Sequence, residues 1–211
     1  MIRHEALLEW RQKYAFSSVL VYVLATVFVC YLSFKRIGDV PTWNALFWII
    51  LLFTAVNTIS KGFLQESRGR QLYVYLLASP KAVILARSIY NAGLTMFMWL
   101  ICLAVYSLLV GNPVENHLLY LGTLALGSIG FAAVLTLMSA IAAQTNNNVT
   151  LMAILSFPIL LPLLLTLITL SKQAADGLQW AVSSKYMIAL LAINAIVFTL
   201  SYLLFPYLWR E

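Results

Sequence analysis

The stretch GFLQESRGRQLYVYLLASPKAVILAR, residues Gly62–Arg87, is the one polar interruption in the chain that is too long to be a simple turn. Together with Lys61 it carries five of the thirteen basic residues, and it also contains Glu66. Nearly every other segment is apolar enough to lie in lipid. We therefore interpret this stretch as the part of the chain that meets a soluble partner.

The composition indicates an integral membrane protein. The 211-residue chain is 63% hydrophobic and only 9% charged, with a mean hydropathy of +0.91, whereas soluble domains carry about 25% charged residues. The net charge of +6 would suggest nucleic-acid binding in a soluble chain. Here the basic residues flank apolar segments, which favours roles in membrane topology and lipid headgroup contact instead.

Six segments are long and apolar enough to cross a membrane, which takes about 20 residues for a hydrocarbon core about 30 Å thick. We predict a single all-α transmembrane domain over residues 1–211, with spans at about 16–34, 43–60, 87–110, 118–143, 149–170 and 186–207. The fifth span contains Pro158 and Pro162. Because proline lacks a backbone donor, we expect a helix break at this pair, either a kink or an unwound segment.

The positions of the basic residues predict the orientation of the chain. Residues 1–15 are amphipathic and predict a short helix lying in the headgroup plane. With six spans, nine basic residues fall on the side of the N-terminus and four on the other, and this majority places both termini in the cytoplasm. The nine are Arg3, Arg11, Lys13, Lys61, Arg68, Arg70, Lys81, Arg87 and Arg210, and the four are Lys35, Arg36, Lys172 and Lys185.

The polar stretch is predicted to form a bend between two helices on the cytoplasmic face. Gly69 is a poor helix residue and marks the break, and Arg70–Leu77 follows as a short amphipathic piece. Ser79 and Pro80 resemble a helix N-cap followed by proline at the first helical position.

The third helix is therefore expected to run from Pro80 to Val110. At about 1.5 Å per residue it would be about 46 Å long, which exceeds the hydrocarbon core. Its first turns must then project from the membrane, with Lys81 and Arg87 reaching the interface.

Two further segments have readable features. The fourth span contains Gly122, Gly127 and Gly130, and small residues let helices approach closely in lipid. The last loop, Ser171–Lys185, contains Trp180, which we expect on a short interfacial helix.

The sequence contains no motif for nucleotide, metal or nucleophile chemistry. It lacks the Walker A, HExxH, CxxC and GxSxG patterns. His4 and His117 fall on opposite sides of the membrane, so they cannot share a site, and both are interpreted as ordinary interfacial histidines. No acidic residue lies inside a predicted span, which disfavours a proton-coupled or ion-coupled carrier. Any energy source is therefore expected on another chain.

Two stretches resemble the CcmB family, the membrane subunits of the cytochrome c maturation ABC complex, within the type-2 ABC exporters. FLQESRGRQLYVYLLASPKAVILAR is similar to the family's coupling segment. GSIGFAAVLTLMSAIAAQTNNNVTLMAILSFPILLPLLL is similar to its fourth and fifth spans. Neutral Asn146–Asn148 depart from the basic turn expected of the family. The implied fold has six spans, an N-terminal interfacial helix and a cytoplasmic coupling helix at residues 62–80.

The resemblance implies a non-catalytic subunit of the bacterial cytoplasmic membrane. Its partners would be a CcmA-like ATPase that binds ATP, CcmC-like and CcmD-like membrane subunits and a CcmE-like haem chaperone. No cofactor is implied for this chain, because haem is handled elsewhere in the complex. Contact with the ATPase falls on a set of polar, apolar and turn residues of the coupling segment. These are Glu66, Arg68, Gly69, Arg70, Leu72, Leu76, Leu77 and Pro80.

Two other functions fit the same pattern. A generic type-2 exporter of a lipid, glycan or drug would have a continuous substrate path between two copies in a homodimer. A scaffold or membrane enzyme without an ATPase would need a reactive group of residues that the sequence does not contain.

Overall fold

The computed structural model describes residues 13–34, 39–64, 80–144, 149–178 and 180–208, and it is helical throughout these ranges apart from short connections. The described helices are α2 (Lys13–Phe34), α3 (Val40–Leu64), α5 (Pro80–Val110), α6 (His117–Gln144), α7 (Val149–Ala175) and α8 (Trp180–Leu208). All six are long and apolar enough to cross a membrane. The prediction of an all-α chain with six helices long and apolar enough to cross a membrane is thus confirmed for the described residues.

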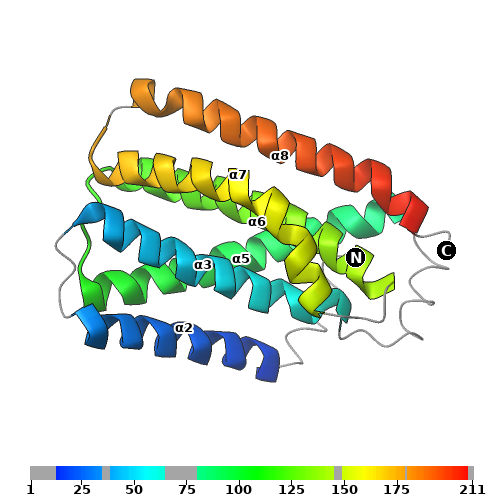
Figure 1. The fold of residues 1–211 in the computed structure, drawn as a ribbon, viewed down its shortest axis with the longest axis horizontal. Helices are drawn as coiled ribbons and strands as arrows, with labels where there is room; N and C mark the ends of the chain where they lie inside the picture. Colours follow the sequence, from blue (N-terminus) through cyan, green and yellow to red (C-terminus); the bar gives the residue numbers. More distant parts are fainter. Residues whose placement is uncertain (1–12, 35–38, 65–79, 145–148, 179, 209–211) are drawn as a thin grey trace.

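Successive helices run in opposite directions along the long axis of the bundle (Figure 1). Their ends gather at two faces, which we name the Pro80 end and the Gly111 end. The Pro80 end holds Lys13, Leu64, Pro80, Gln144, Val149 and Leu208, and the Gly111 end holds Phe34, Val40, Val110, His117, Ala175 and Trp180. Both ends of the predicted coupling segment therefore belong to the same face of the bundle.

Helix α6 is the centre of the bundle and packs against α3, α5, α7 and α8. In its apolar stretch 78% of the residues are buried, against 17% in α2 at the periphery. Two glycines let the neighbours approach. A Cβ at Gly127 would lie 3.1 Å from the Trp99 ring, and a Cβ at Gly130 would collide with Asn194 Oδ1 of α8. The glycines of this span therefore allow close packing of α6 against α5 and against α8.

The helix ends show where hydropathy alone misplaces a boundary. The expected third helix, Pro80–Val110, agrees with α5. The expected sixth span begins too late, because α8 already starts at Trp180. The separate interfacial helix expected around Trp180 is therefore wrong. Helix α7 likewise continues to Ala175, so the connection between α7 and α8 is shorter than predicted.

The prolines of α7 do not unwind it. Pro158 and Pro162 both lie inside a continuous α-helix, and in Figure 1 the ribbon of α7 changes direction part of the way along its length. The expected interruption is thus a bend within the helix and not an unwound segment. Both proline rings lie on the exposed surface of the bundle, where they need not clash with a neighbouring helix.

Two predicted elements lie largely outside the described residues. The interfacial helix at residues 1–15 overlaps them only at 13–15, which form the first residues of α2. The coupling segment at residues 62–80 overlaps them only at its two ends, the close of α3 and the first residue of α5.

Candidate functional site

The start of α5 is the described segment that directly follows the predicted coupling segment, and its buried face is polar. Arg87, Ser88, Asn91 and Thr95 are all buried. Their positions i, i+1, i+4 and i+8 place them on one side of the helix. Asn91 Nδ2 donates a hydrogen bond to Thr136 Oγ1 of α6 at 2.8 Å. We call these four residues of α5 the polar stripe.

Arg87 is buried, with 7% of its surface exposed, although its position in the sequence predicts an interfacial side chain. The expected interfacial position of Arg87 in the membrane stays a prediction. One turn before Arg87, Val83 and Ile84 already pack against α6 and α8. Because burying a guanidinium in a membrane bundle is costly, Arg87 is a candidate functional residue.

Lys81 is exposed, as expected for the interface, and its Nζ lies 4.5 Å from the centre of the Tyr202 ring. This cation–π pair joins the first turn of α5 to α8. Beside it, Val83 and Ile84 pack with Ala140 of α6 and Phe205 of α8 in a hydrophobic cluster separate from the main core. The start of α5 therefore has its own set of contacts.

In the half of α3 nearest the Pro80 end, buried hydroxyl groups bond within their own helix. Thr54 Oγ1 donates to Ile50 O, and Thr58 Oγ1 donates to Thr54 O, each at 2.7 Å. Ser60 Oγ donates to Asn57 O at 3.4 Å. Bonds of this kind satisfy the hydroxyl without linking α3 to a neighbour.

In the other half of α3, by contrast, hydrogen bonds tie the helix to α7. Trp48 Nε1 donates to Ser171 Oγ at 2.7 Å, and Ser171 Oγ donates to Asn44 Oδ1 at 3.0 Å. Asn44 Nδ2 in turn donates to Ile168 O at 3.0 Å. We call Asn44, Trp48 and Ser171 the α3–α7 network.

The same half of α3 also bonds to α5 and its following loop. Trp43 Nε1 donates to Gly111 O at 2.9 Å, and the Tyr106 hydroxyl donates to Trp43 O at 3.2 Å. Trp99 Nε1 donates to Leu51 O at 3.1 Å. These side chains satisfy their polar atoms while their rings fill the core.

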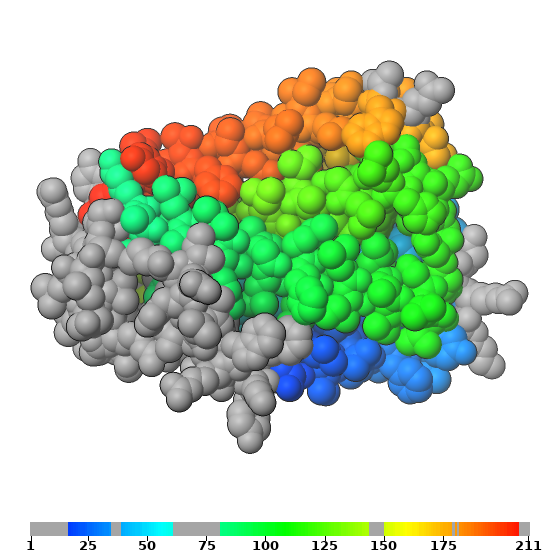
Figure 2. Space-filling model, turned by 180° about the vertical axis from the view of Figure 1, so that it is seen from behind, coloured from blue at the N-terminus to red at the C-terminus, as the bar shows by residue number. Residues whose placement is uncertain are grey.

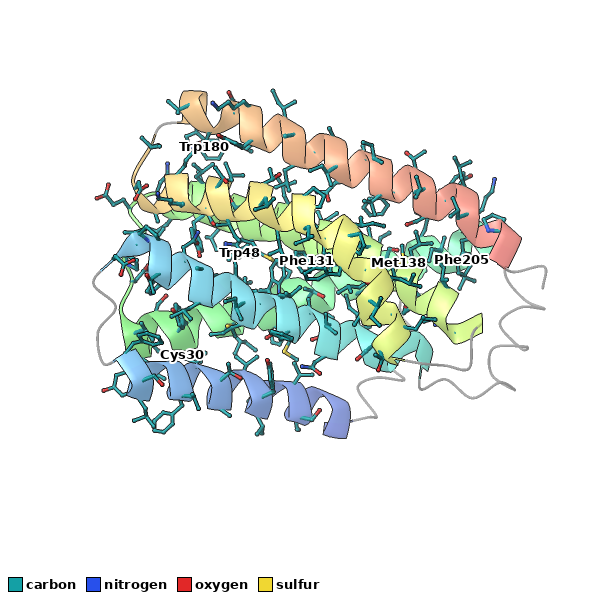
Figure 3. All side chains as sticks on the ribbon, viewed as in Figure 1. Cys30, Trp48, Phe131, Met138, Trp180 and Phe205 are labelled. Atoms are coloured by element: carbon teal, nitrogen blue, oxygen red, sulfur yellow. The ribbon has the colours of Figure 1, made fainter. Side chains whose placement is uncertain are left out.

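Aromatic rings fill the space between these hydrogen bonds. Trp43 lies with its ring centroid 5.4 Å from Phe47 and 4.9 Å from Tyr106. Trp99 meets Trp48 and Phe131 edge to face at 5.6 and 5.3 Å. Figure 3 shows the labelled Trp48 and Phe131 pointing into the interior of the bundle. The Gly111 half of the core is therefore cross-linked by several hydrogen bonds between helices, whereas the Pro80 half contains the Asn91–Thr136 bond and hydroxyl groups that bond within their own helix.

Few of the predicted site residues can be placed. Pro80 is the first residue of α5, and Pro158 and Pro162 lie within α7. The remaining predicted coupling residues lie outside the described part of the chain. They are Glu66, Arg68, Gly69, Arg70, Leu72, Leu76 and Leu77.

The histidine that the structure describes has local partners. His117 is exposed at the Gly111 end, and its ring nitrogens lie 3.3 Å from Asn112 Nδ2 and from Glu115 O. Within the described ranges, no group of three or more His, Cys, Asp or Glu side chains could hold a metal ion. His4 lies outside the described residues.

The polar stripe was missed at the level of sequence, although a signal for it is present. Arg87, Asn91 and Thr95 recur every four residues within an otherwise apolar span, and Ser88 follows Arg87. This is the period that places side chains on one helix face. The α3–α7 network left no such signal, because Asn44 and Ser171 are far apart in the sequence.

Comparison with known proteins assigns a family. A family model described as CcmB protein matches residues 1–205. No curated protein and no solved structure gives a match.

Proposed function

The chain belongs to the CcmB protein family, and from that premise we propose that it is the membrane subunit of an ABC transporter complex for cytochrome c maturation. The family match, which covers nearly the whole bundle, is the observation that carries this proposal. The chain would act as a non-catalytic, multi-pass subunit with the type-2 exporter arrangement of helices.

The energy for the cycle would come from a partner. The sequence contains no Walker A motif, so ATP would bind to a CcmA-like ATPase. The membrane subunit would work beside CcmC-like and CcmD-like subunits. It would couple ATP hydrolysis either to haem handling or to the release of a haem-loaded CcmE-like chaperone. In this proposal no haem or metal ligand belongs to this chain.

The coupling segment at residues 62–80 would form the contact with the ATPase. Glu66, Arg68 and Arg70 would make polar contacts, and the leucines at 72, 76 and 77 would fill an apolar groove on the partner. Gly69 would provide the bend. The proposal requires the Pro80 end to face the cytoplasm, which the excess of basic residues on that side supports.

The contrast between the two halves of the bundle supports a mechanical role for α5. This helix has 31 residues, about 46 Å at 1.5 Å per residue, and it begins where the coupling segment ends. The α3–α7 network and the aromatic core would hold the Gly111 half in place. The polar stripe would then let the start of α5 shift relative to α6, because polar side chains can exchange hydrogen-bond partners.

The proposal is tested by changing the coupling segment in the complex purified with its ATPase. Glu66→Lys would reverse a polar contact, and Leu72→Asp would place a charge in the apolar groove. We expect each variant to retain less ATPase in a pull-down and to mature less cytochrome c in cells.

Matched controls at the opposite end of the bundle use the same changes of side chain. Glu115→Lys and Leu178→Asp alter exposed residues at the Gly111 end, and both should leave ATPase retention at the wild-type level. Undiminished ATPase retention and coupling in Glu66→Lys and Leu72→Asp would remove the coupling segment from the mechanism.

A further inference from the structure

The start of α5 is attached to α8 by a cation–π contact and by a shared hydrophobic cluster. Lys81 and Ile84 are three residues apart on α5, and Tyr202 and Phe205 are three residues apart on α8. Each pair therefore shares a helix face. Lys81 meets the Tyr202 ring, and Ile84 packs in the same cluster as Phe205. We call these four residues the α5–α8 clamp.

Both space-filling and ribbon views show this attachment. In Figure 2 the red end of α8 lies directly against the teal start of α5, and Figure 1 shows the same two segments together at the Pro80 end. Phe205 is buried, with 3% of its surface exposed, whereas Tyr202 is 40% exposed. The clamp thus has a dry part inside the bundle and a cation–π part at its surface.

Further along α8, a different contact attaches the helix to α6. Asn194 Nδ2 donates to Leu126 O at 3.1 Å, and Asn194 Oδ1 lies against Gly130, where a Cβ would collide with it. From Asn194 to Phe205 the helix covers about 16 Å at 1.5 Å per residue. Helix α8 is therefore held by α6 near its middle, and by α5 together with Ala140 of α6 at its C-terminal end.

We propose that Tyr202 and Phe205 are positioning residues through which a displacement of the start of α5 tilts α8 about the Asn194 contact with α6. The inference rests on the proposed function, because the displacement would come from the coupling segment. If the inference holds, α8 moves together with the start of α5, although α8 is not adjacent to the coupling segment in the sequence.

The test measures the tilt of α8 in the complex with its ATPase in lipid nanodiscs. Spin labels replace Leu203 on α8 and Ile129 on α6, both exposed, in a background without the native cysteines. We expect the distance between the labels to change when ATP is added and trapped with vanadate. Tyr202→Leu combined with Phe205→Ala should abolish this change while the ATPase remains bound.

Conservative variants separate positioning from folding. Tyr202→Phe keeps the ring that the Lys81 cation faces, and Phe205→Leu keeps a large apolar side chain, so both should retain the ATP-dependent change. Tyr202→Leu removes only the ring. It should raise the fraction of molecules in which α8 is detached from α5 by roughly two- to fivefold, which corresponds to the free energy of one exposed cation–π pair. A full ATP-dependent change in the double variant would overturn the inference, as would no change in the wild type.

A second label pair makes failure of the inference distinguishable from failure of the proposed function. Labels at Ala82 on α5 and Leu203 on α8 report the clamp without nucleotide and without the ATPase. The clamp predicts a narrow distance distribution that broadens in the Tyr202→Leu, Phe205→Ala variant. Equal widths would overturn the clamp, whereas failure of the wild-type complex to retain any ATPase would overturn the proposed function.

Discussion

Replacing Ser171 with alanine removes the one hydroxyl that both accepts from Trp48 and donates to Asn44. Trp48 Nε1 lies 2.7 Å from Ser171 Oγ, and Ser171 Oγ lies 3.0 Å from Asn44 Oδ1. All three residues are buried. The substitution therefore leaves an indole N–H and an amide oxygen without these partners in the core, while the Asn44 bond to Ile168 O remains.

The expected loss of stability follows from the number of bonds broken. Hydrogen bonds between helices in a membrane protein contribute about 0.6 kcal/mol on average and about 1.7 kcal/mol at most. Ser171 Oγ also donates to Ile168 O within α7 at 3.1 Å, so two of its three bonds link α7 to α3. Losing those two should lower the free energy of unfolding by roughly 1–3 kcal/mol. Values from soluble proteins, about 1–3 kcal/mol for each orphaned group, would predict more. The membrane values apply here because the unfolded chain in detergent or lipid also finds partners.

The assay is unfolding by SDS in mixed micelles, followed by far-ultraviolet circular dichroism. Ser183→Ala is the matched control, because Ser183 is equally buried but its Oγ has no hydrogen-bond partner among the described residues. That variant should stay within roughly 0.5 kcal/mol of the wild type, since no bond is lost. Equal stabilities of Ser171→Ala and Ser183→Ala would refute the reasoning. A double-mutant cycle with Trp48→Phe should show a coupling energy of about 0.5–1.5 kcal/mol.

Three further changes test other parts of the structure. Gly130→Ala should lower the free energy of unfolding by about 1–3 kcal/mol through overpacking against α8. Gly122→Ala is the control and should not destabilise the protein, because there is open space where its Cβ would lie. Equal effects of the two variants in the same SDS assay would contradict the packing of α6 against α8. Pro158→Ala combined with Pro162→Ala should straighten α7 and lower cytochrome c maturation without lowering stability, and intact maturation would show that the bend does not matter. Hydrogen bonds from the side chain and the backbone N–H of Thr42, in the first turn of α3, hold the pKa of Asp39 below its usual range. The ionised Asp39 side chain should therefore stabilise the start of α3 at neutral pH, and this stabilisation should be lost only as the pH falls through the lowered pKa. An NMR titration in which the Asp39 carboxyl has the ordinary pKa of aspartate would contradict this prediction.

Local chemistry made some boundaries predictable and left others hidden. The start of α5 could be predicted because Ser79–Pro80 combines a capping residue with proline at the first helical position. Helix α8 starts six residues before the predicted sixth span, since Ser183, Ser184 and Lys185 lower the hydropathy of its first turns. A hydropathy window locates the apolar part of a helix, and helices continue beyond it into the interface.

The candidate site also has one feature that the sequence pattern could predict and others that it could not. The polar stripe repeats along one helix, so its face can be read from the spacing of Arg87, Asn91 and Thr95. Its partner, Thr136 of α6, cannot be read from that spacing. The α3–α7 network and the α5–α8 clamp join residues from distant parts of the chain. Such contacts follow from the packing of whole helices, which no local pattern in a single sequence specifies.

Photo-crosslinking from the coupling segment tests the central claim most directly. A photoreactive amino acid at position 72 in cells should form an adduct with the nucleotide-hydrolysing subunit, and the same amino acid at position 178, at the Gly111 end, should not. The account is contradicted if position 72 captures no nucleotide-hydrolysing protein, or if a membrane-impermeant reagent added from outside the cytoplasmic membrane labels residues 62–80.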